Sequence, residues 1–144
     1  MSDVTKSEPQ VNEFAKSLGV EILSYGGGKS ELSLDVKISM LNKGGSVNGG
    51  IISALLDYSL GAALVSSLKI EEWCATTSLN INYLNPSFDE SKLVANGVVT
   101  KRGKSVAFCS GSVVDQTGKT IATATGTWAV WESKPRKFSG IGND

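Results

Sequence analysis

Apolar and polar residues alternate along six stretches of the chain, which predicts six β-strands. The alternation is clearest in residues 29–40, where every second position is apolar: Leu32, Leu34, Val36 and Ile38. Similar patterns predict the other strands over residues 20–25, 73–84, 92–101, 105–114 and 120–131. Glycine-containing turns at residues 26–28, 102–104 and 115–118 separate neighbouring strands, and Asn85-Pro86 ends the third strand.

Two other stretches predict helices. Residues 11–18 place Phe14, Ala15 and Leu18 near one face of a short helix, and Gly19 stops it. Residues 48–67 are apolar on nearly all sides, which is typical of a helix buried inside a protein. The surrounding segment 44–68 begins with glycines and contains five serines and a central aspartate, so it is a poor candidate for a membrane-spanning helix.

The order of the elements is one helix, two strands, one long helix and four strands. An antiparallel sheet wrapped around the long central helix satisfies this order, because the helix then buries its apolar surface against the sheet. The predicted fold class is therefore α+β. With 144 residues and no internal repeat, the chain is expected to form a single domain over residues 1–144, with flexible ends at about 1–10 and 133–144.

Histidine is absent from the sequence, which excludes whole classes of chemistry. Neither a Ser-His-Asp triad nor a Cys-His nucleophile can form. Cys74 and Cys109 alone are a poor ligand set for zinc, so we expect no metal and no redox cofactor. Both cysteines lie within apolar alternating runs and are expected to be small buried hydrophobic residues in a reducing compartment.

The charges are balanced, with 14 Lys and Arg residues against 14 Asp and Glu residues. This balance gives no electrostatic footprint for nucleic acid or for an anionic membrane. The polar start of the chain lacks the basic and then apolar order of a secretory signal. We therefore expect a cytoplasmic protein that neither binds nucleic acid nor inserts into a membrane.

Asp57 is the only charged residue in segment 44–68 and requires an explanation. An unpaired charge on so apolar a helix is costly, so the carboxylate should be ion-paired, protonated or next to a wet functional pocket. If the helix starts at Gly49, the N–H of that residue is an unsatisfied donor at the positive end of the helix dipole. Such a donor is suited to receive a developing oxyanion.

Gly49 and Asp57 are eight residues apart, which separates them by about 12 Å along one helix at about 1.5 Å per residue. One substrate carbonyl cannot contact both groups, because a base must come within about 3 Å of its target, or act through one water. Two antiparallel copies of the helix remove this difficulty, since the start of one then lies beside the middle of the other. If the Gly49 N–H and the Asp57 carboxylate act on the same carbonyl group, the protein is expected to be a homodimer with two equivalent sites.

Four motifs follow one another along the chain: Gly45-Ser46-Val47-Asn48-Gly49-Gly50 with Asp57 seven residues later, Asn80-Ile81-Asn82-Tyr83-Leu84-Asn85-Pro86, the basic turn within residues 98–108, and Ala122-Thr123-Ala124-Thr125-Gly126-Thr127. In this order they resemble the PaaI-type hotdog-fold acyl-CoA thioesterase family over about residues 20–131. The resemblance implies a hotdog fold and hydrolysis of an acyl-CoA thioester to free acid and CoA. It also implies an obligate homodimer, with a homotetramer as the expected further assembly. No cofactor is implied, because coenzyme A is part of the substrate.

The resemblance also assigns roles to residues. Asp57 is the general base or nucleophile, Gly49 and Asn42 polarise the thioester carbonyl, and Thr76 helps to orient the attacking water. The substrate-binding positions are Asn48, Gly50, Tyr83 and the basic turn of Lys101, Arg102 and Lys104, whose charges suit the phosphates of CoA. Asn48 is a departure, because the family usually has histidine there. Asparagine can cap a helix but does not titrate near neutral pH.

Each assignment has a structural alternative. Asp57 is alternatively the buried partner of a distant Lys or Arg, and the basic turn is alternatively a solvated hairpin tip. Gly49 and Gly50, taken without Asp57, are alternatively residues that permit close helix packing. Tyr83, Trp128 and Trp131 are expected to be core or interface aromatic residues. For the whole protein, one alternative is a catalytically weak acyl-CoA or fatty-acyl binding protein on the same fold. Another is an oligomer subunit whose apolar helix is only an interface.

Overall fold

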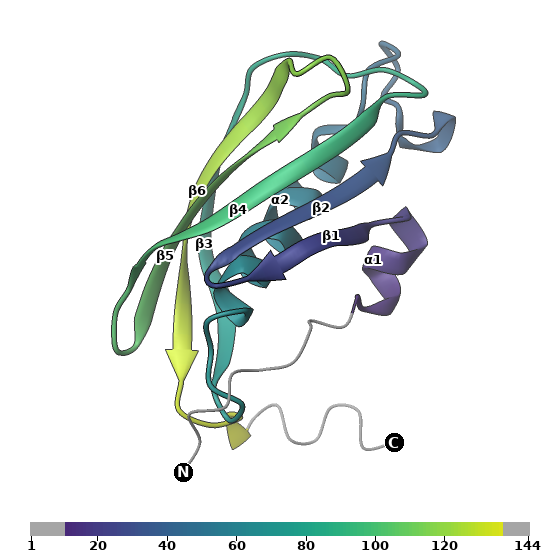
Figure 1. The fold of residues 1–144 in the computed structure, drawn as a ribbon. Helices are drawn as coiled ribbons and strands as arrows, with labels where there is room; N and C mark the ends of the chain where they lie inside the picture. The colour runs from purple at the N-terminus through teal and green to yellow at the C-terminus, as the bar shows by residue number, and fades with distance from the viewer. Residues whose placement is uncertain (1–10, 137–144) are drawn as a thin grey trace.

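A computed structural model describes residues 11–136 of the chain. Its elements follow the predicted order (Figure 1): α1 (Glu13–Leu18), β1 (Glu21–Gly26), β2 (Lys29–Asp35), the 3-10 helix η1 (Ile38–Met40), α2 (Gly49–Val65), β3 (Trp73–Tyr83), β4 (Lys92–Arg102), β5 (Val106–Val114) and β6 (Thr120–Trp131). The expectation of flexible ends falls mainly on residues 1–10 and 137–144, which lie outside the described residues.

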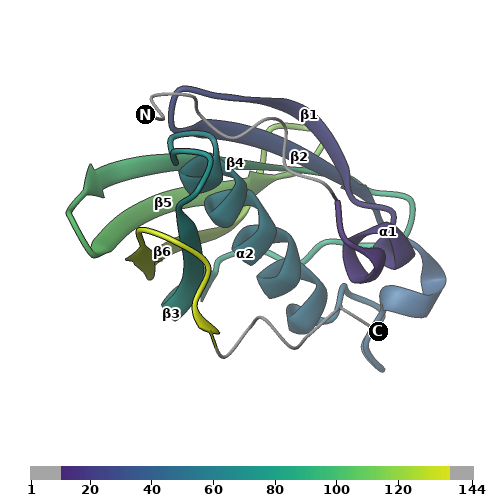
Figure 2. The ribbon, with the colours of Figure 1, turned by 90° about the horizontal axis from the view of Figure 1, so that it is seen from below.

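One antiparallel sheet contains the strands in the order β1-β2-β4-β5-β6-β3. The sheet curves around α2, which packs against each of the strands (Figure 1 and Figure 2). The buried side of α2 carries four leucines with 0% exposure: Leu55, Leu56, Leu60 and Leu64. A sheet wrapped around a long central helix confirms the predicted α+β hotdog fold. Within residues 11–136, no helix has both the length and the apolar character needed to cross a membrane.

The prediction of a strand over residues 29–40 was wrong beyond Asp35. Asp35 pairs with Lys92, the first residue of β4, so the residues after Asp35 have no neighbouring strand on that side. The chain turns instead into η1, where Ile38 is 74% exposed. This turn leads the chain towards the start of α2, and the Asn48 N–H donates to the Met40 carbonyl at 2.8 Å.

The central helix ends at Val65 rather than at residue 67, because two serines satisfy its last carbonyl groups. Ser66 Oγ donates to the Ala63 carbonyl at 2.6 Å, and Ser67 Oγ donates to the Leu64 carbonyl at 2.8 Å. Ser66 Oγ also accepts the Gly28 N–H at 2.8 Å. The end of α2 is therefore tied to the turn between β1 and β2.

The sheet comes very close to α2 at Gly97 in β4. A Cβ atom at this position would lie 2.5 Å from the Ser59 carbonyl oxygen and 2.9 Å from Ser30 Oγ. Ser30 Oγ donates to the same Ser59 carbonyl at 2.6 Å, and both serines are buried. The glycine and the buried hydrogen bond therefore fix the middle of α2 against the sheet, and with it the position of Asp57.

Candidate active site

The start of α2 presents a backbone donor. Asn48 caps the helix, because its Oδ1 accepts the Gly50 N–H at 2.8 Å. Gly49 is the first helical residue, and within residues 11–136 its N–H has no hydrogen-bond acceptor. Tyr83 covers Gly49: its hydroxyl donates to the Gly49 carbonyl at 3.0 Å, and a Cβ at Gly49 would lie 3.3 Å from the ring. The structure thus brings Asn48, Gly49, Gly50 and Tyr83 together at the positive end of the helix dipole.

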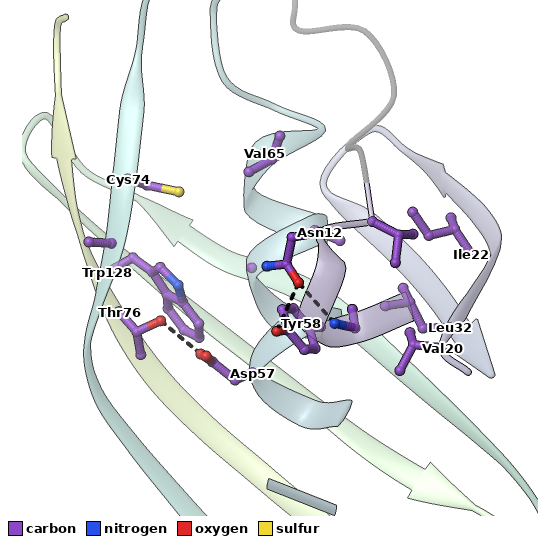
Figure 3. Close-up of a pocket in the computed structure, with 15 residues that line it drawn as sticks. Asn12, Val20, Ile22, Leu32, Asp57, Tyr58, Val65, Cys74, Thr76 and Trp128 are labelled. Carbon is purple, nitrogen blue, oxygen red and sulfur yellow. Dashed lines mark hydrogen bonds between the residues drawn. The ribbon is translucent and has the colours of Figure 1, made fainter. Parts of the chain in front are cut away.

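Asp57 lies in the middle of α2 and is half-buried. Thr76 in β3 donates its hydroxyl hydrogen to Asp57 Oδ1 at 2.7 Å (Figure 3). The ion pairs found within residues 11–136 involve other carboxylates, those of Glu13 and Glu72. The alternative of a structural ion pair at Asp57 therefore finds no support in this part of the chain.

A pocket of about 340 Å³ opens beside Asp57. Asp57, Thr76 and Trp128 lie on one side of α2, and Asn12 and Tyr58 lie on its other side, where α1 packs (Figure 3). The other described residues of the lining are apolar, and they include Val20, Leu32, Val65 and Cys74. Asp57 is the only charged residue among the described residues of the lining. The pocket is therefore suited to an uncharged, mostly apolar group held next to a carboxylate.

Sequence reasoning did not single out Asn12 and Tyr58. The Tyr58 hydroxyl donates to Asn12 Oδ1 at 3.2 Å, and the same oxygen caps α1 by accepting the Ala15 N–H at 2.9 Å. The Phe14 ring meets the Tyr58 ring edge-on, with centroids 6.4 Å apart. These contacts attach α1 to the residue that follows Asp57. Asparagine before a short helix is an N-cap signal that would have identified Asn12, but no local signal indicates its contact with Tyr58.

Gly49 and Asp57 do not share a pocket. Gly49 lines a second pocket of about 340 Å³, together with Ser46, Tyr83 and Ser87, whereas Asp57 lines the first. This separation agrees with their eight-residue spacing along one straight helix. Within a single chain, the helix-start donor and the carboxylate are therefore not directed at one carbonyl group.

Asn42 forms a turn with Ser46 ahead of α2. Its Oδ1 accepts the N–H groups of Gly44 at 2.9 Å and Ser46 at 3.3 Å, and its Nδ2 donates to Ser46 Oγ at 2.9 Å. The side chain thus holds the segment that leads into the helix. A role for Asn42 as a second donor to the substrate carbonyl stays a prediction. Its Nδ2 has a second hydrogen that is available for such a bond.

The three cations of the basic turn have different surroundings. Arg102 Nη2 lies 2.5 Å from Glu72 Oε2, and Arg102 Nη1 donates to the carbonyls of Gly103 and Lys104. Its guanidinium is therefore engaged within the protein and shapes the hairpin. Lys101 and Lys104 are exposed and line two different surface hollows. These two lysines remain the candidates for contacts with phosphate.

Within residues 11–136, neither Cys74 nor Cys109 forms a disulfide bond. Cys109 is 2% exposed, and burial raises the pKa of its thiol to about 12, with a further contribution from Cys74. Cys109 is thus a buried residue, as predicted, whereas Cys74 is half-buried and lines the pocket beside Asp57. Among residues 11–136, no group of three or more His, Cys, Asp or Glu residues is arranged to hold a metal ion.

Comparison with known proteins assigns the chain to a family. The model of the thioesterase superfamily matches residues 44–122, which is more than half of the chain. The chain belongs to the thioesterase superfamily.

Particular relatives narrow this assignment. Acyl-coenzyme A thioesterase PaaI from Escherichia coli is 31% identical over 112 residues, which cover 78% of each chain. Human acyl-coenzyme A thioesterase 13 is 27% identical over 124 residues, which cover 85% of this chain and 88% of the human protein. The solved structure of the E. coli PaaI protein matches with a TM-score of 0.78 and 28% identity, and covers 82% of this chain and 83% of that one. These findings confirm the resemblance to PaaI-type hotdog thioesterases and identify the chain as a thioester hydrolase.

Proposed function

We propose that the protein hydrolyses an acyl-CoA thioester to the free acid and CoA. One observation carries the proposal: the Asp57 carboxylate faces an otherwise uncharged pocket. Within residues 11–136, its only side-chain hydrogen bond is the one from Thr76. Two relatives that are named acyl-coenzyme A thioesterases support the choice of substrate class. The pocket volume of about 340 Å³ lies at the lower end of the range of about 300–1,000 Å³ for small-molecule sites. The pocket is therefore expected to hold the acyl group, while the CoA part extends over the surface.

Asp57 acts as a general base on water or attacks the thioester carbon itself. On the water route, the water oxygen bonds to the carbonyl carbon while a water proton passes to the carboxylate. The C–S bond then breaks, and the CoA thiolate leaves and takes up a proton. Thr76 donates to one carboxylate oxygen, which holds the carboxylate in place and leaves the other oxygen for the water.

The oxyanion is stabilised by the Gly49 N–H of a second copy of the chain. A helix-start N–H is effective here because it is fixed in place and lies at the positive end of the dipole. Asn42 is the proposed second donor, and Lys101 and Lys104 are the proposed contacts for the CoA phosphates. Asn48 keeps the helix start in order by capping it, but its amide takes no part in proton transfer.

Strand β3 is the proposed contact between the two copies. It lies at an edge of the sheet, its eleven residues contain neither a charged residue nor a proline, and none of them is buried in the single chain. Edge strands usually carry charges or prolines that prevent pairing. Antiparallel pairing of two β3 strands would place the two α2 helices side by side in opposite directions, with Gly49 of one copy near Asp57 of the other. A homotetramer would then be a pair of such dimers.

Replacement of Asp57 tests the proposal directly. The wild type is expected to release CoA from an acyl-CoA, measured as free thiol, and Asp57→Asn should lower kcat by about 10²–10⁴-fold, the usual contribution of a general base. Asp35→Asn makes the same change at an exposed carboxylate in β2 and serves as the matched control. Undiminished turnover by Asp57→Asn would remove Asp57 from the mechanism.

A mixture of two inactive variants tests the shared site. Gly49→Pro removes the N–H, and the backbone accepts proline there because it is the first helical position and Asn48 already has φ −59° and ψ 132°. Gly49→Ala keeps the N–H and controls for the added carbon beside Tyr83. When Gly49→Pro and Asp57→Asn are refolded together, about half of the dimers are mixed and contain one intact site of two. About one quarter of the wild-type activity should return, and no return in demonstrably mixed dimers would contradict the shared site.

A second candidate is an acyl-CoA or fatty-acyl binding protein with weak turnover. It is favoured by Asn48, which supplies a helix cap where the family usually has a titratable residue. Such a protein would gain thermal stability from acyl-CoA without releasing CoA, so turnover by the wild type separates the two candidates. A purely structural oligomer subunit is disfavoured by the pocket beside Asp57. For any of these functions, the cytoplasm is the expected location.

A further inference from the structure

The indole N–H of Trp128 is a hydrogen-bond donor that the fold itself does not use. Trp128 lies in β6, is 2% exposed and lines the pocket beside Asp57 (Figure 3). Within residues 11–136, the indole Nε1–H has no hydrogen-bond acceptor. The nitrogen is nevertheless not sealed off, because it is not one of the completely buried side-chain polar atoms of this part of the chain. Buried indole N–H groups usually have a partner. Because this N–H is open to the pocket, an atom of the molecule that fills the pocket is expected to accept from it.

Gly61 leaves space in front of this N–H. A Cβ atom at Gly61 would lie 3.8 Å from Trp128 Nε1. Apart from its chain neighbours and the nearby backbone of its own helix, no other atom of the described residues would lie within 4 Å of this Cβ. Gly61 follows Asp57 by four residues, so the two lie on the same face of α2, separated along its axis by about 6 Å, or about one turn. Trp128 is also the cross-strand partner of Thr76, whose hydroxyl holds Asp57. The glycine in front of the donor is thus about one helical turn from Asp57, and both residues line the pocket with Trp128.

The distance from the carboxylate restricts which atom of a substrate can reach the indole. In a reactive complex, the carbonyl carbon lies about 3–3.5 Å from the attacking atom. A group that reaches the indole must therefore lie one or two carbons further along the acyl chain. A hydroxyl or keto oxygen on the third carbon meets this requirement and accepts the hydrogen bond. A plain aliphatic chain would cover the N–H without offering an acceptor, which weakens binding.

We propose that Trp128 determines specificity and that the preferred substrates are acyl-CoA thioesters with a hydroxyl or keto oxygen on the third carbon of the acyl group. This inference rests on the proposed thioesterase function and narrows it to a substrate class. The indole donates to that oxygen in the bound substrate and in the transition state alike. The preference should therefore appear in KM and kcat/KM rather than in kcat.

A first experiment compares substrates that differ at one position. 3-Hydroxybutyryl-CoA offers an acceptor, butyryl-CoA lacks it, and 3-methylbutyryl-CoA has a methyl group in its place. For the wild type, kcat/KM for the hydroxy compound should exceed both other values by about tenfold or more. Equal values for the hydroxy and methyl compounds would overturn the inference, whether or not any Trp128 variant folds.

A second experiment removes the donor. Trp128→Phe keeps an aromatic ring without the N–H and should lower kcat/KM for 3-hydroxybutyryl-CoA about tenfold, while butyryl-CoA changes by less than about threefold. Trp131→Phe makes the same change three residues further along β6 and should retain the preference. A preference that survives in folded Trp128→Phe would assign it to another group and overturn the role of Trp128.

Binding measurements separate this inference from the proposed function. Dissociation constants of the three thioesters are measured by calorimetry with Asp57→Asn, which does not consume them. Tighter binding of the hydroxy compound supports the inference even if the wild type releases no CoA. Equal binding overturns it even if the wild type is an active thioesterase. Lack of turnover of every acyl-CoA by the wild type contradicts only the proposed function.

Discussion

The close approach of β4 to α2 makes Gly97→Ala a severe test of the packing. The new Cβ would lie 2.5 Å from the Ser59 carbonyl oxygen, whereas close carbon–oxygen contacts are normally about 3.3–3.6 Å. Relief requires a movement of about 1 Å, and the obstructing atom belongs to the backbone of α2 rather than to a flexible side chain. The methyl group would also displace Ser30 Oγ, which donates to the same carbonyl.

Two costs add up in this variant. Overpacking of a core costs about 1–3 kcal/mol, and loss of the buried Ser30–Ser59 hydrogen bond costs about 1–3 kcal/mol more. We therefore expect Gly97→Ala to lower the free energy of unfolding by about 2–6 kcal/mol, a large part of a typical total of about 5–15 kcal/mol. Because α2 carries Asp57, any folded fraction should also lose thioesterase activity.

Urea unfolding followed by circular dichroism measures the effect, at one fixed protein concentration because assembly shifts apparent stability. Gly61→Ala is the matched control: it adds the same methyl group to α2, but its Cβ meets its nearest neighbour at an ordinary 3.8 Å. Alanine there should be neutral or should stabilise the helix by up to about 1 kcal/mol. A wild-type midpoint for Gly97→Ala, or an equal loss in Gly61→Ala, would refute the reasoning.

Thr76→Val should lower kcat about tenfold by removing the hydrogen bond to Asp57, whereas Thr76→Ser should retain activity; equal rates of CoA release would show that this bond is unimportant. The pKa of Asp115 is held below its ordinary value, mainly by the Thr117 hydroxyl, so Asp115 contributes stability above about pH 4 that is lost as the pH falls through its folded-state pKa. The urea midpoint of the wild type should therefore fall more between pH 7 and pH 3 than that of Asp115→Asn, and parallel losses would contradict this. Burial raises the pKa of Cys109 to about 12, so a thiol reagent at pH 8 should modify Cys109 only after unfolding; Cys109→Ser should lower the thiol count in denaturant but not in the native state.

Local patterns were sufficient to predict most of the fold. The last strand was predicted over residues 120–131 and observed as Thr120–Trp131, because its alternation, its turn and its pairing all end together. Residues 36–40 show the limit of such patterns. Ile38 continues the alternation, but β4 starts opposite Asp35, so strand pairing on that side stops there. Alternation describes side chains, whereas the end of a strand depends on how far its neighbour extends.

Part of the candidate site could also be predicted from local patterns, whereas contacts between distant residues could not. The positions of Asn48, Gly49 and Asp57 follow from one helix and its cap, so the sequence was enough to find them. The Arg102–Glu72 ion pair joins residues 30 apart, and no local pattern indicates it. Trp128 was expected to be a core or interface residue and is indeed buried. The indole nitrogen lies next to Gly61 on a different element, and no local pattern indicates this contact.

The uncharged edge strand β3 has a consequence for the synthesis of this protein. In the proposed assembly, a newly folded chain exposes the open backbone groups of β3 until it pairs with a second copy, and other extended segments can pair with these groups instead. Lysine on this strand would suppress such pairing with other segments, but it would also block the pairing proposed to complete the active site. Aggregation and productive assembly therefore compete for one surface. We expect the yield of active protein to depend on how quickly two copies of the chain associate.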